Sequence, residues 1–397
     1  MRIGIFTDSY KPYTSGVVTS ISTFKEEMTR LGHEVYIFAP SYPNYNDTED
    51  NVFRFFSVPS PTNPDYTLAV PVYPGLNMIV KKLRMDIIHV QSPFTMGRVG
   101  LHYARKYNIP LVITYHSRYD QYVHYVPLAQ DLAKEVTIKY SSSFCNHCDH
   151  VVVPSQDILE IIREFEVNKP ITVIPTGIPL YKFEGANSSW LRENYDIPEQ
   201  NKILLFVGRL TKEKNLPFLI KAFQKIKMQI PDTTLVLTAQ GPMEAELKSL
   251  CKNLGLTGSD VIFTGALPFE TLVDVYHSAD LFVFASLTET QGLVVTEAMA
   301  AGLPVVAVRA SGVQDMVDDG LDGILTNEDM DEFVAAVCKV LVDKDLYDEL
   351  KGNAYRKAEM MSSRSMALKM EKLYTKLLEQ RIYRSNRFLD IGSWFGN

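Results

Sequence analysis

The sequence predicts an α/β protein made of two Rossmann-like domains, and three observations lead to this prediction. Short apolar runs alternate with helix-length segments along most of the chain. Several runs, such as 203–207 (ILLFV), are apolar at every position, which is typical of parallel strands covered on both faces. The length of 397 residues exceeds one ordinary hydrophobic core and favours two.

The first half of the chain predicts successive βα units. Its predicted strands are short apolar runs bounded by turn residues, at 2–7, 34–39, 52–56, 87–91, 111–115 and 150–154. Its predicted helices carry apolar residues three and four apart, at 17–31, 76–84, 97–107 and 128–143. Such units form a parallel sheet with helices on both faces.

The second half repeats this architecture after a polar, turn-rich segment, 181–201, which we interpret as a hinge. Its predicted strands are 203–207, 234–238, 261–264, 281–285 and 305–308. We therefore predict a first domain over 1–180 and a second over 200–374, and a helical pattern follows at 373–387.

Composition narrows the range of functions. The net charge of −7 argues against a nucleic-acid partner, which requires a basic face. No run of eighteen apolar residues predicts a membrane span, and the first residues lack the apolar segment of a signal peptide, so we expect a cytoplasmic protein. Cys145 and Cys148 form a C-x-x-C, but no second pair completes a zinc set, and we interpret both as structural.

The most informative segment is T-E-T-Q-G-L-V-V-T-E, which carries Glu289 and Glu297 on either side of a glycine. It predicts a polar loop at 286–292 followed by a helix at 293–301. Glu289 and the N–H groups of residues 290–293 then lie at the positive end of a helix. Such a site suits a polyhydroxylated anion, because carboxylates accept from hydroxyls and amides donate to oxygens.

A second polar segment lies about eighty residues upstream, where a predicted strand runs into G-R-L-T-K-E-K-N. Gly208 allows a close approach of the backbone at the strand end. Arg209 and Lys214 can both reach an anion at the carboxyl edge of the sheet, Arg209 as a fork of donors and Lys214 as a point charge.

Together, GRLTKEKN and ETQGLVVTEAMAAGLPVV resemble the nucleotide-sugar site of retaining glycosyltransferases of the GT-B fold. The start of the chain, MRIGIFTDSYKPYTSGVVTSI, is similar to that family's first strand and glycine loop, and the resemblance covers nearly the whole chain. It implies two Rossmann-like domains facing across a cleft, the first binding the acceptor and the second the nucleotide sugar. It also implies that a C-terminal helix, 375–397, crosses back to the first domain.

The resemblance assigns catalytic roles to four residues. Glu289 would accept from a hydroxyl of the donor sugar, and Arg209 and Lys214 would neutralise the departing diphosphate. His116, in LVITYHSRYD, would contact the sugar or the phosphate. Glu297 would accept from the ribose hydroxyls. The resemblance places the remaining donor contacts in loop backbones, at Gly16, Gly265, Ala266, Leu267, Thr290, Gln291, Gly292 and Leu293.

The chain departs from the family pattern at one turn. The family has an acidic residue before a Gly-Pro pair, where this chain has Thr238-Ala239-Gln240-Gly241-Pro242. We expect the turn to form without any contact made by that carboxylate.

The family retains anomeric configuration, and the sequence contains no clear pair of catalytic carboxylates of the kind that retaining hydrolases use. Our mechanistic hypothesis is a front-face displacement in which the leaving diphosphate helps to deprotonate the acceptor. No D-x-D motif lies near the glycine loops, so we expect no required metal cofactor and leave open a divalent cation that stimulates.

The segment 116–126 (HSRYDQYVHYV) closely resembles bacterial diacylglycerol α-glucosyltransferases, which transfer glucose from UDP-glucose to form an α-glucosyl glycolipid at the membrane surface. Tyr119, Tyr122 and Tyr125 are therefore candidate acceptor contacts, since tyrosine suits a boundary between apolar and wet surroundings. Packing within a loop is the alternative interpretation.

A lipid acceptor implies peripheral contact with an anionic membrane, expected at the inner face of the cell membrane. Lys81, Lys82 and Arg84 are candidate contacts to anionic headgroups. The helix that carries them also has the apolar spacing of a core-facing helix.

Two other functions remain open from the sequence. One is a transferase acting on a soluble sugar, a glycan or a phospholipid. The other is a nucleotide-sugar-binding protein without turnover, against which the presence of all four catalytic candidates argues.

Overall fold

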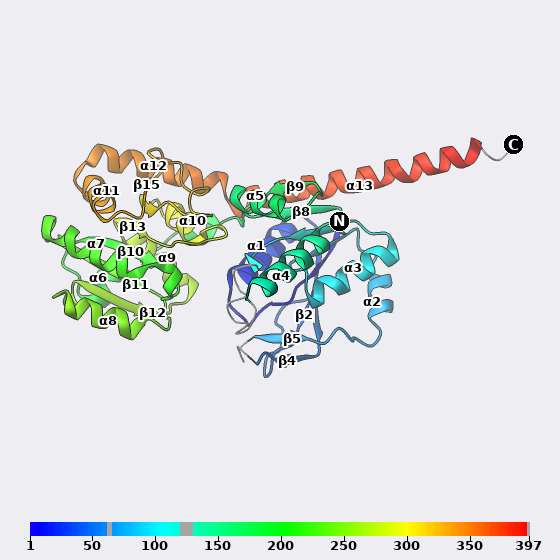
Figure 1. Cartoon of the computed structure of the whole chain (residues 1–397), viewed down its shortest axis with the longest axis horizontal. Coiled ribbons are helices and arrows are strands. Elements are labelled where there is room, and N and C mark those ends of the chain that lie inside the picture. The colour runs from blue at the N-terminus through cyan, green and yellow to red at the C-terminus, as the bar shows by residue number, and fades with distance from the viewer. Residues whose placement is uncertain (62–65, 120–129, 395–397) are drawn as a thin grey trace. The chain divides into compact units, whose positions relative to one another are not determined.

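The computed structural model describes residues 1–61, 66–119 and 130–394. It divides into two compact units (Figure 1). Unit 1 comprises Met1–Gly177 and Ser363–Asn397, and unit 2 comprises Ile178–Ser362. Each unit contains its own parallel sheet, and the predicted α/β class with two Rossmann-like domains is confirmed.

Unit 1 is built on a seven-stranded parallel sheet of order β3-β2-β1-β6-β7-β8-β9. Its strands are β1 Arg2–Phe6, β2 Glu34–Pro40, β3 Val52–Phe55, β6 Ile87–Val90, β7 Leu111–Thr114, β8 His150–Val153 and β9 Ile171–Val173. Its helices are α1 Gly16–Arg30, α2 Leu76–Leu83, α3 Thr95–Tyr107, α4 Gln130–Cys145, α5 Gln156–Glu164 and α13 Ser363–Trp394. A separate two-stranded antiparallel ribbon pairs β4 Ser57–Pro59 with β5 Thr67–Ala69.

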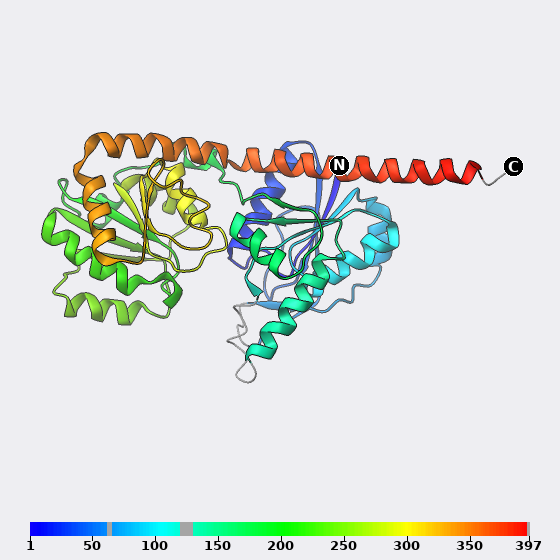
Figure 2. The ribbon, with the colours of Figure 1, turned by 45° about the horizontal axis from the view of Figure 1, so that its top comes forward.

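Helix α13 belongs to unit 1 (Figure 2). Its residues Met366, Met370 and Tyr374, spaced four apart, are buried in the same core cluster as Ile3 of β1 and Ile21 of α1. The helix therefore enters unit 1 at Ser363, earlier than the predicted start at 375, because the buried face begins with its first turn.

Unit 2 is built on a six-stranded parallel sheet of order β12-β11-β10-β13-β14-β15. Its strands are β10 Lys202–Val207, β11 Thr233–Thr238, β12 Val261–Gly265, β13 Leu281–Phe284, β14 Val305–Val308 and β15 Ile324–Thr326. Its helices are α6 Trp190–Tyr195, α7 Leu216–Gln229, α8 Glu244–Asn253, α9 Phe269–Ser278, α10 Leu293–Ala300, α11 Met330–Val342 and α12 Lys344–Met360, with 3₁₀ turns η2 Leu180–Phe183 and η3 Lys212–Lys214.

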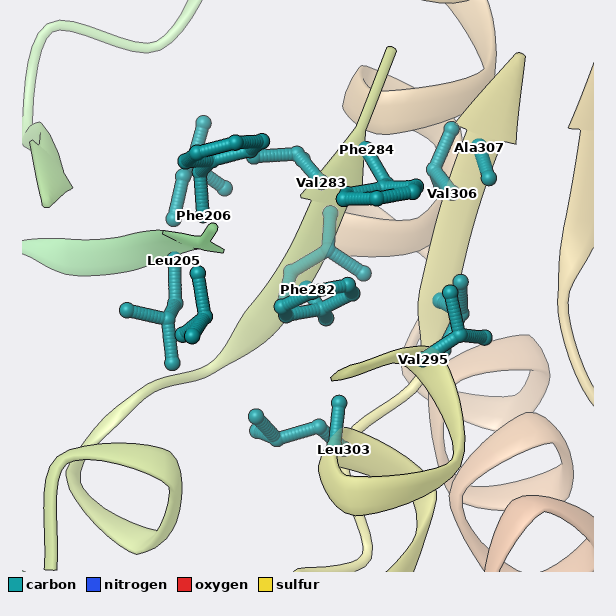
Figure 3. Close-up of a cluster of buried hydrophobic side chains, with 14 of the residues drawn as sticks. Leu205, Phe206, Phe282, Val283, Phe284, Val295, Leu303, Val306 and Ala307 are labelled. Carbon is teal, nitrogen blue, oxygen red and sulfur yellow. The ribbon is translucent and has the colours of Figure 1, made fainter. Parts of the chain in front are cut away.

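The core of unit 2 is a set of aromatic and branched side chains from neighbouring strands (Figure 3). Phe206 stacks on Phe284 with ring centroids 5.7 Å apart, and Phe284 lies at the same distance from Phe282. All three side chains are fully buried. This packing fixes β10 against β13, the two strands whose carboxyl ends carry the donor-site candidates.

The segment 181–201, interpreted from its composition as a hinge, lies wholly within unit 2. It contains α6, and Leu191 of that helix is fully buried in the core of unit 2. The division between the units falls at 177/178 and 362/363 instead. Phe183 and Ile197 of the same segment are also buried in this core, and Trp190 packs against it, so several apolar residues anchor a segment whose composition is mainly polar.

In each sheet the strand order reverses at one point, between β1 and β6 in unit 1 and between β10 and β13 in unit 2. Open α/β sheets bind ligands outside the carboxyl ends of the strands at this switch point. We therefore expect the ligand-binding residues among those that follow these four strands.

Candidate functional site

Lys214 and Glu289 meet at the switch point of unit 2. Lys214 ends η3, just after β10, and Glu289 lies in the loop after β13. Lys214 Nζ donates to Glu289 Oε1, and the two side chains are 17% and 16% exposed. The ammonium also lies 5.9 Å from the centre of the Phe284 ring. A cation and an acceptor for hydroxyls are thus held side by side at the edge of the sheet.

The loop that carries Glu289 is held by backbone contacts on both sides. Leu287 N donates to Glu213 O at 3.0 Å, and Glu289 N donates to Ser311 O at 3.1 Å. Gly312 must be a glycine here, because a Cβ at this position would lie 2.5 Å from Glu289 O. Its φ of +75° is also one that glycine adopts most readily.

The backbone of Thr290, Gln291, Gly292 and Leu293 leads into helix α10. Gly292 is the N-cap with φ +76°, in the left-handed region, and Leu293 is the first residue of the helix. The first N–H groups of α10 therefore point out of its positive end, beside Glu289. Gln291 and Gly292 are buried, so this helix end is shielded from water, and helix N-termini of this kind can bind anions.

Glu297 lies one turn into α10. Its Oε2 accepts a hydrogen bond of 2.8 Å from the hydroxyl of Tyr276, a fully buried side chain of α9. Desolvation raises the pKa of Glu297, and the hydrogen bond from Tyr276 partly opposes that shift. Its second carboxylate oxygen remains available as an acceptor.

Arg209 is exposed directly after β10 and follows Gly208, whose φ is +151°. The neighbouring turn at 238–242 forms as predicted without an acidic residue. Leu210 N donates to Gln240 O at 3.2 Å, and a Cβ on Gly241 would lie 2.4 Å from Leu210 O. The turn therefore supports the Arg209 loop by close backbone packing.

Gly265 ends β12, and Ala266 and Leu267 lie in the loop that leads to α9. Gly265 has φ +75° and forms an isolated bridge with Ala239. Ala266 is exposed and Leu267 is partly buried against the core of unit 2. The bridge places this loop beside the 238–242 turn at the carboxyl edge of the sheet.

Gly16 opens helix α1 in unit 1 and is exposed. Ser15 is the N-cap, and its hydroxyl accepts from Val18 N at 3.3 Å. The chain thus has a second helix start facing the carboxyl edge of a sheet, with the backbone at Gly16 open to approach.

His116 follows β7, the second strand beyond the switch point of unit 1. Its Nε2 lies 2.7 Å from Oε1 of Gln91, which follows β6. Desolvation lowers the pKa of His116 to about 4, so the imidazole is neutral at pH 7. His116 and Gln91 line a cavity of about 40 Å³ within unit 1, together with His89 and Thr114. That volume accommodates a few water molecules.

Tyr119 is partly buried among aromatic side chains. Its ring lies edge to face with Phe94 at 5.1 Å and with Tyr115 at 5.0 Å. This packing favours the structural interpretation for the ring. Tyr122 and Tyr125 lie outside the described residues.

Helix α2 divides its two faces between the core and the surface. Leu76 and Val80 are buried in the core of unit 1, as the apolar spacing predicts. Lys81, Lys82 and Arg84 are exposed on and just after the helix. The core-facing and surface-binding interpretations of this helix are therefore compatible.

Cys145 and Cys148 are buried free cysteines, and Cys148 Sγ donates to Phe144 O at 3.5 Å. Burial raises the pKa of Cys145 to about 12, which makes it an inert thiol. In the described parts of the chain no three His, Cys, Asp or Glu side chains gather closely enough to hold a metal ion. Among the same residues, no helix is both long and apolar enough to cross a bilayer.

Sequence reasoning missed the partners that hold the site residues: Gln91 for His116, Tyr276 for Glu297 and Gly312 for the Glu289 loop. It also missed Asp8, whose Oδ1 accepts from Met96 N at 3.0 Å and which ties the end of β1 to α3. Gln91 and Asp8 carried a usable signal, because each is a polar residue within two positions of the end of a strand beside the switch point.

Comparison with known proteins gives matches over both units. Residues 189–357 match the family model described as Glycosyl transferases group 1, and residues 14–182 match Glycosyltransferase Family 4. The chain is 37% identical over 333 residues to alpha-monoglucosyldiacylglycerol synthase of Streptococcus pneumoniae, covering 82% of this chain and 75% of that protein. It is 31% identical over 403 residues to the protein of the same name from Acholeplasma laidlawii, covering 98% and 100%.

More distant relatives and solved structures also match this chain over most of its length. A GDP-mannose-dependent alpha-mannosyltransferase of Corynebacterium glutamicum is 28% identical over 365 residues, covering 89% of this chain and 84% of that protein. Sucrose-phosphate synthase of Thermosynechococcus elongatus superimposes with a TM-score of 0.76 at 24% identity, covering 96% and 99%. HepE of Anabaena, in complex with UDP, gives 0.76 at 19% identity, covering 95% and 100%. The two TM-scores show that these structures share the fold of this chain.

Proposed function

The chain belongs to the GT-B glycosyltransferases and is a hexosyltransferase; on that premise we propose that it transfers glucose, with retention of configuration, from UDP-glucose to 1,2-diacylglycerol at a membrane surface. The observation that carries the proposal is the similarity to the Acholeplasma laidlawii synthase, which runs along both chains almost entirely. Both the donor-side unit and the acceptor-side unit therefore have counterparts in a glucosyldiacylglycerol synthase.

Unit 2 takes the nucleotide sugar in this proposal. Glu289 accepts from a sugar hydroxyl while the N–H groups at the start of α10 donate to the sugar or phosphate oxygens. Glu297, oriented by Tyr276, accepts from the ribose hydroxyls. HepE, a protein of similar fold, holds UDP-glucose in its crystal structure, which supports a UDP-sugar donor.

The diphosphate leaves with negative charge, and Arg209 and Lys214 supply the compensating cations. Lys214 is already placed by Glu289, so little reorganisation is needed when the charge develops. With these two cations we expect the diphosphate to depart without a required metal cofactor, and a divalent cation that binds with the donor is expected to stimulate only. The leaving oxygen itself then takes the acceptor proton on the same face of the sugar.

Unit 1 takes the lipid acceptor and contacts the membrane. Lys81, Lys82 and Arg84 form an exposed basic group suited to anionic headgroups. Apolar side chains are exposed on the same unit: Met78 of α2 is 72% exposed, and Val58 and Leu68, paired across the β4–β5 ribbon, are 44% and 46% exposed. A peripheral membrane protein requires both exposed basic side chains and exposed apolar side chains.

The test offers UDP-glucose, UDP-galactose, UDP-N-acetylglucosamine and GDP-mannose, each with diacylglycerol, phosphatidylinositol or free glucose, in mixed micelles with and without EDTA. The expected product is α-glucosyldiacylglycerol from UDP-glucose, formed also in EDTA. The Glu359→Gln variant, on the exposed face of α12, serves as a control for substitution by itself.

The panel also separates the alternatives. Product with GDP-mannose alone would reassign the donor toward that of the mannosyltransferase relatives. Product on free glucose but not on lipid would replace the lipid acceptor with a soluble one. Nucleotide binding without any product would point to a binding protein, and loss of all product in EDTA would contradict the expectation of a metal-independent reaction.

A further inference from the structure

His89 on β6 and His116, just after the neighbouring strand β7, differ in their hydrogen bonding. His89 of β6 is bonded through both ring nitrogens, with Tyr374 OH 2.6 Å from Nδ1 and Thr114 Oγ1 2.7 Å from Nε2. His116 is hydrogen-bonded through Nε2, which lies 2.7 Å from Oε1 of Gln91. His89 is thus a structural histidine that joins α13 to the sheet, whereas His116 depends on Gln91 for its orientation.

The chemistry of Gln91 determines which nitrogen of His116 carries the hydrogen. An amide oxygen can only accept, so the imidazole must donate to it from Nε2. In a neutral ring the other nitrogen, Nδ1, then carries the lone pair. Gln91 itself is 5% exposed, so this acceptor belongs to the buried interior of unit 1.

We propose that Gln91 is a positioning residue that holds His116 as the Nε2–H tautomer, so that Nδ1 accepts a hydrogen bond from a hydroxyl of the bound sugar. The proposal rests on the proposed function for the identity of the ligand. It assigns His116 an acceptor role toward a hydroxyl, and not a donor role toward the departing diphosphate.

The surroundings keep the ring neutral, as this role requires. Burial lowers the pKa of His116 to about 4, and the titratable group that interacts with it electrostatically is His89, whose own pKa is lowered to about 3 by burial. Neither ring is an imidazolium at neutral pH. A protonated His116 would carry hydrogens on both nitrogens and could accept nothing.

The tautomer is measured directly by ¹⁵N NMR of histidine-labelled, full-length protein without ligand. The expected result between pH 6 and 8 is a protonated Nε2 and an unprotonated Nδ1 for His116. In Gln91→Leu, which keeps the bulk of the side chain and removes the acceptor, the Nε2–H resonance is expected to exchange with water and disappear. A wild-type His116 protonated on Nδ1, or an unchanged resonance in Gln91→Leu, would overturn the proposal.

Thr172→Val is the matched control. Thr172 Oγ1 lies 2.8 Å from Nε2 of His150, another histidine of the same sheet. Removal of this hydroxyl is expected to alter the His150 resonances and leave those of His116 unchanged. If both histidines change in either variant, the effect is a general loosening of the sheet and the specific role of Gln91 is refuted.

Steady-state kinetics distinguish the effect of the orientation of His116 from the effect of its tautomer. Gln91→Glu places an acceptor near the same point, but its negative charge favours an imidazolium with a hydrogen on Nδ1. We expect kcat to fall about 10-fold in both Gln91→Leu and Gln91→Glu, with the KM for the donor changed less than about 2-fold, and Thr172→Val to behave as wild type. Wild-type kcat in Gln91→Glu together with a protonated Nδ1 would overturn the acceptor role. If UDP-glucose and diacylglycerol give no turnover, the proposed function fails while the NMR result still decides the tautomer.

Discussion

Lys214 and Glu289 form an ion pair although 75 residues separate them, and their side chains are only 17% and 16% exposed. The pair joins η3, just after β10, to the loop after β13, across the point where the strand order of unit 2 reverses. Each side chain orders the other before any ligand arrives, so little conformational entropy is lost when the donor binds.

Glu289→Gln is expected to lower kcat by about 10²–10³-fold, because the neutral amide is a weaker acceptor and no longer anchors Lys214 electrostatically. Steady-state kinetics with UDP-glucose measures the change, and the affinity for UDP alone is expected to stay within about 3-fold. Glu359→Gln, on α12, should match wild type. A kcat for Glu289→Gln within a few-fold of wild type would remove Glu289 from the active site.

Gly312→Ala is expected to displace the Glu289 loop, because the added Cβ would lie 2.5 Å from Glu289 O and 2.9 Å from Gln291 N. We expect the free energy of unfolding to fall by about 1–3 kcal/mol and kcat to fall by about 10²-fold, measured by denaturant titration and steady-state assay. Gly320→Ala isolates the backbone strain, since Gly320 has φ +77° and nothing within 4 Å of a Cβ. Equal losses of activity in the two variants would contradict the role of the close approach.

Replacing Lys81, Lys82 and Arg84 together by Gln is expected to weaken binding to vesicles that contain phosphatidylglycerol. Each basic residue near an anionic bilayer contributes about 1 kcal/mol, so the partition coefficient should fall by about 100-fold, as measured by sedimentation. The loss should shrink as salt is raised, because exposed charges are screened.

The control for membrane binding replaces three exposed lysines of unit 2, Lys221, Lys252 and Lys344, by Gln, which changes the net charge equally. This variant should bind vesicles as wild type does. A comparable loss in both triple variants would show that net charge, and not the surface of α2, governs the attraction.

Stability is expected to fall as the pH drops from about 6.5 toward 4, in part because of His116. Its folded pKa is lowered to about 4, so below pH 6.5 the unfolded chain takes up a proton that the folded chain refuses. Between pH 7 and pH 5 this residue alone costs about 2 kcal/mol. His116→Gln should flatten the pH dependence of the free energy of unfolding by about that amount in urea titrations. An unchanged slope would mean that His116 titrates normally.

Local sequence was sufficient to predict most of the parallel strands and the residues that follow them. Runs such as 203–207 are continuously apolar, and β10 forms at Lys202–Val207. Segment 181–201 was interpreted as a hinge, but the division between the units falls at 177/178 and 362/363. Its polar majority hid the apolar residues, Phe183, Leu191 and Ile197, that are buried in the core of unit 2. Composition averages over a window, whereas burial is decided by single side chains.

The sequence by itself determined that Arg209, Lys214, Glu289 and His116 lie at strand ends, since apolar runs and turn residues are local signals. Only the tertiary structure decided which of them meet. Lys214 reaches Glu289 because β10 pairs with β13, and Gln91 reaches His116 because β6 pairs with β7. Strand order arises from packing between residues far apart in the chain, and no local pattern encodes it.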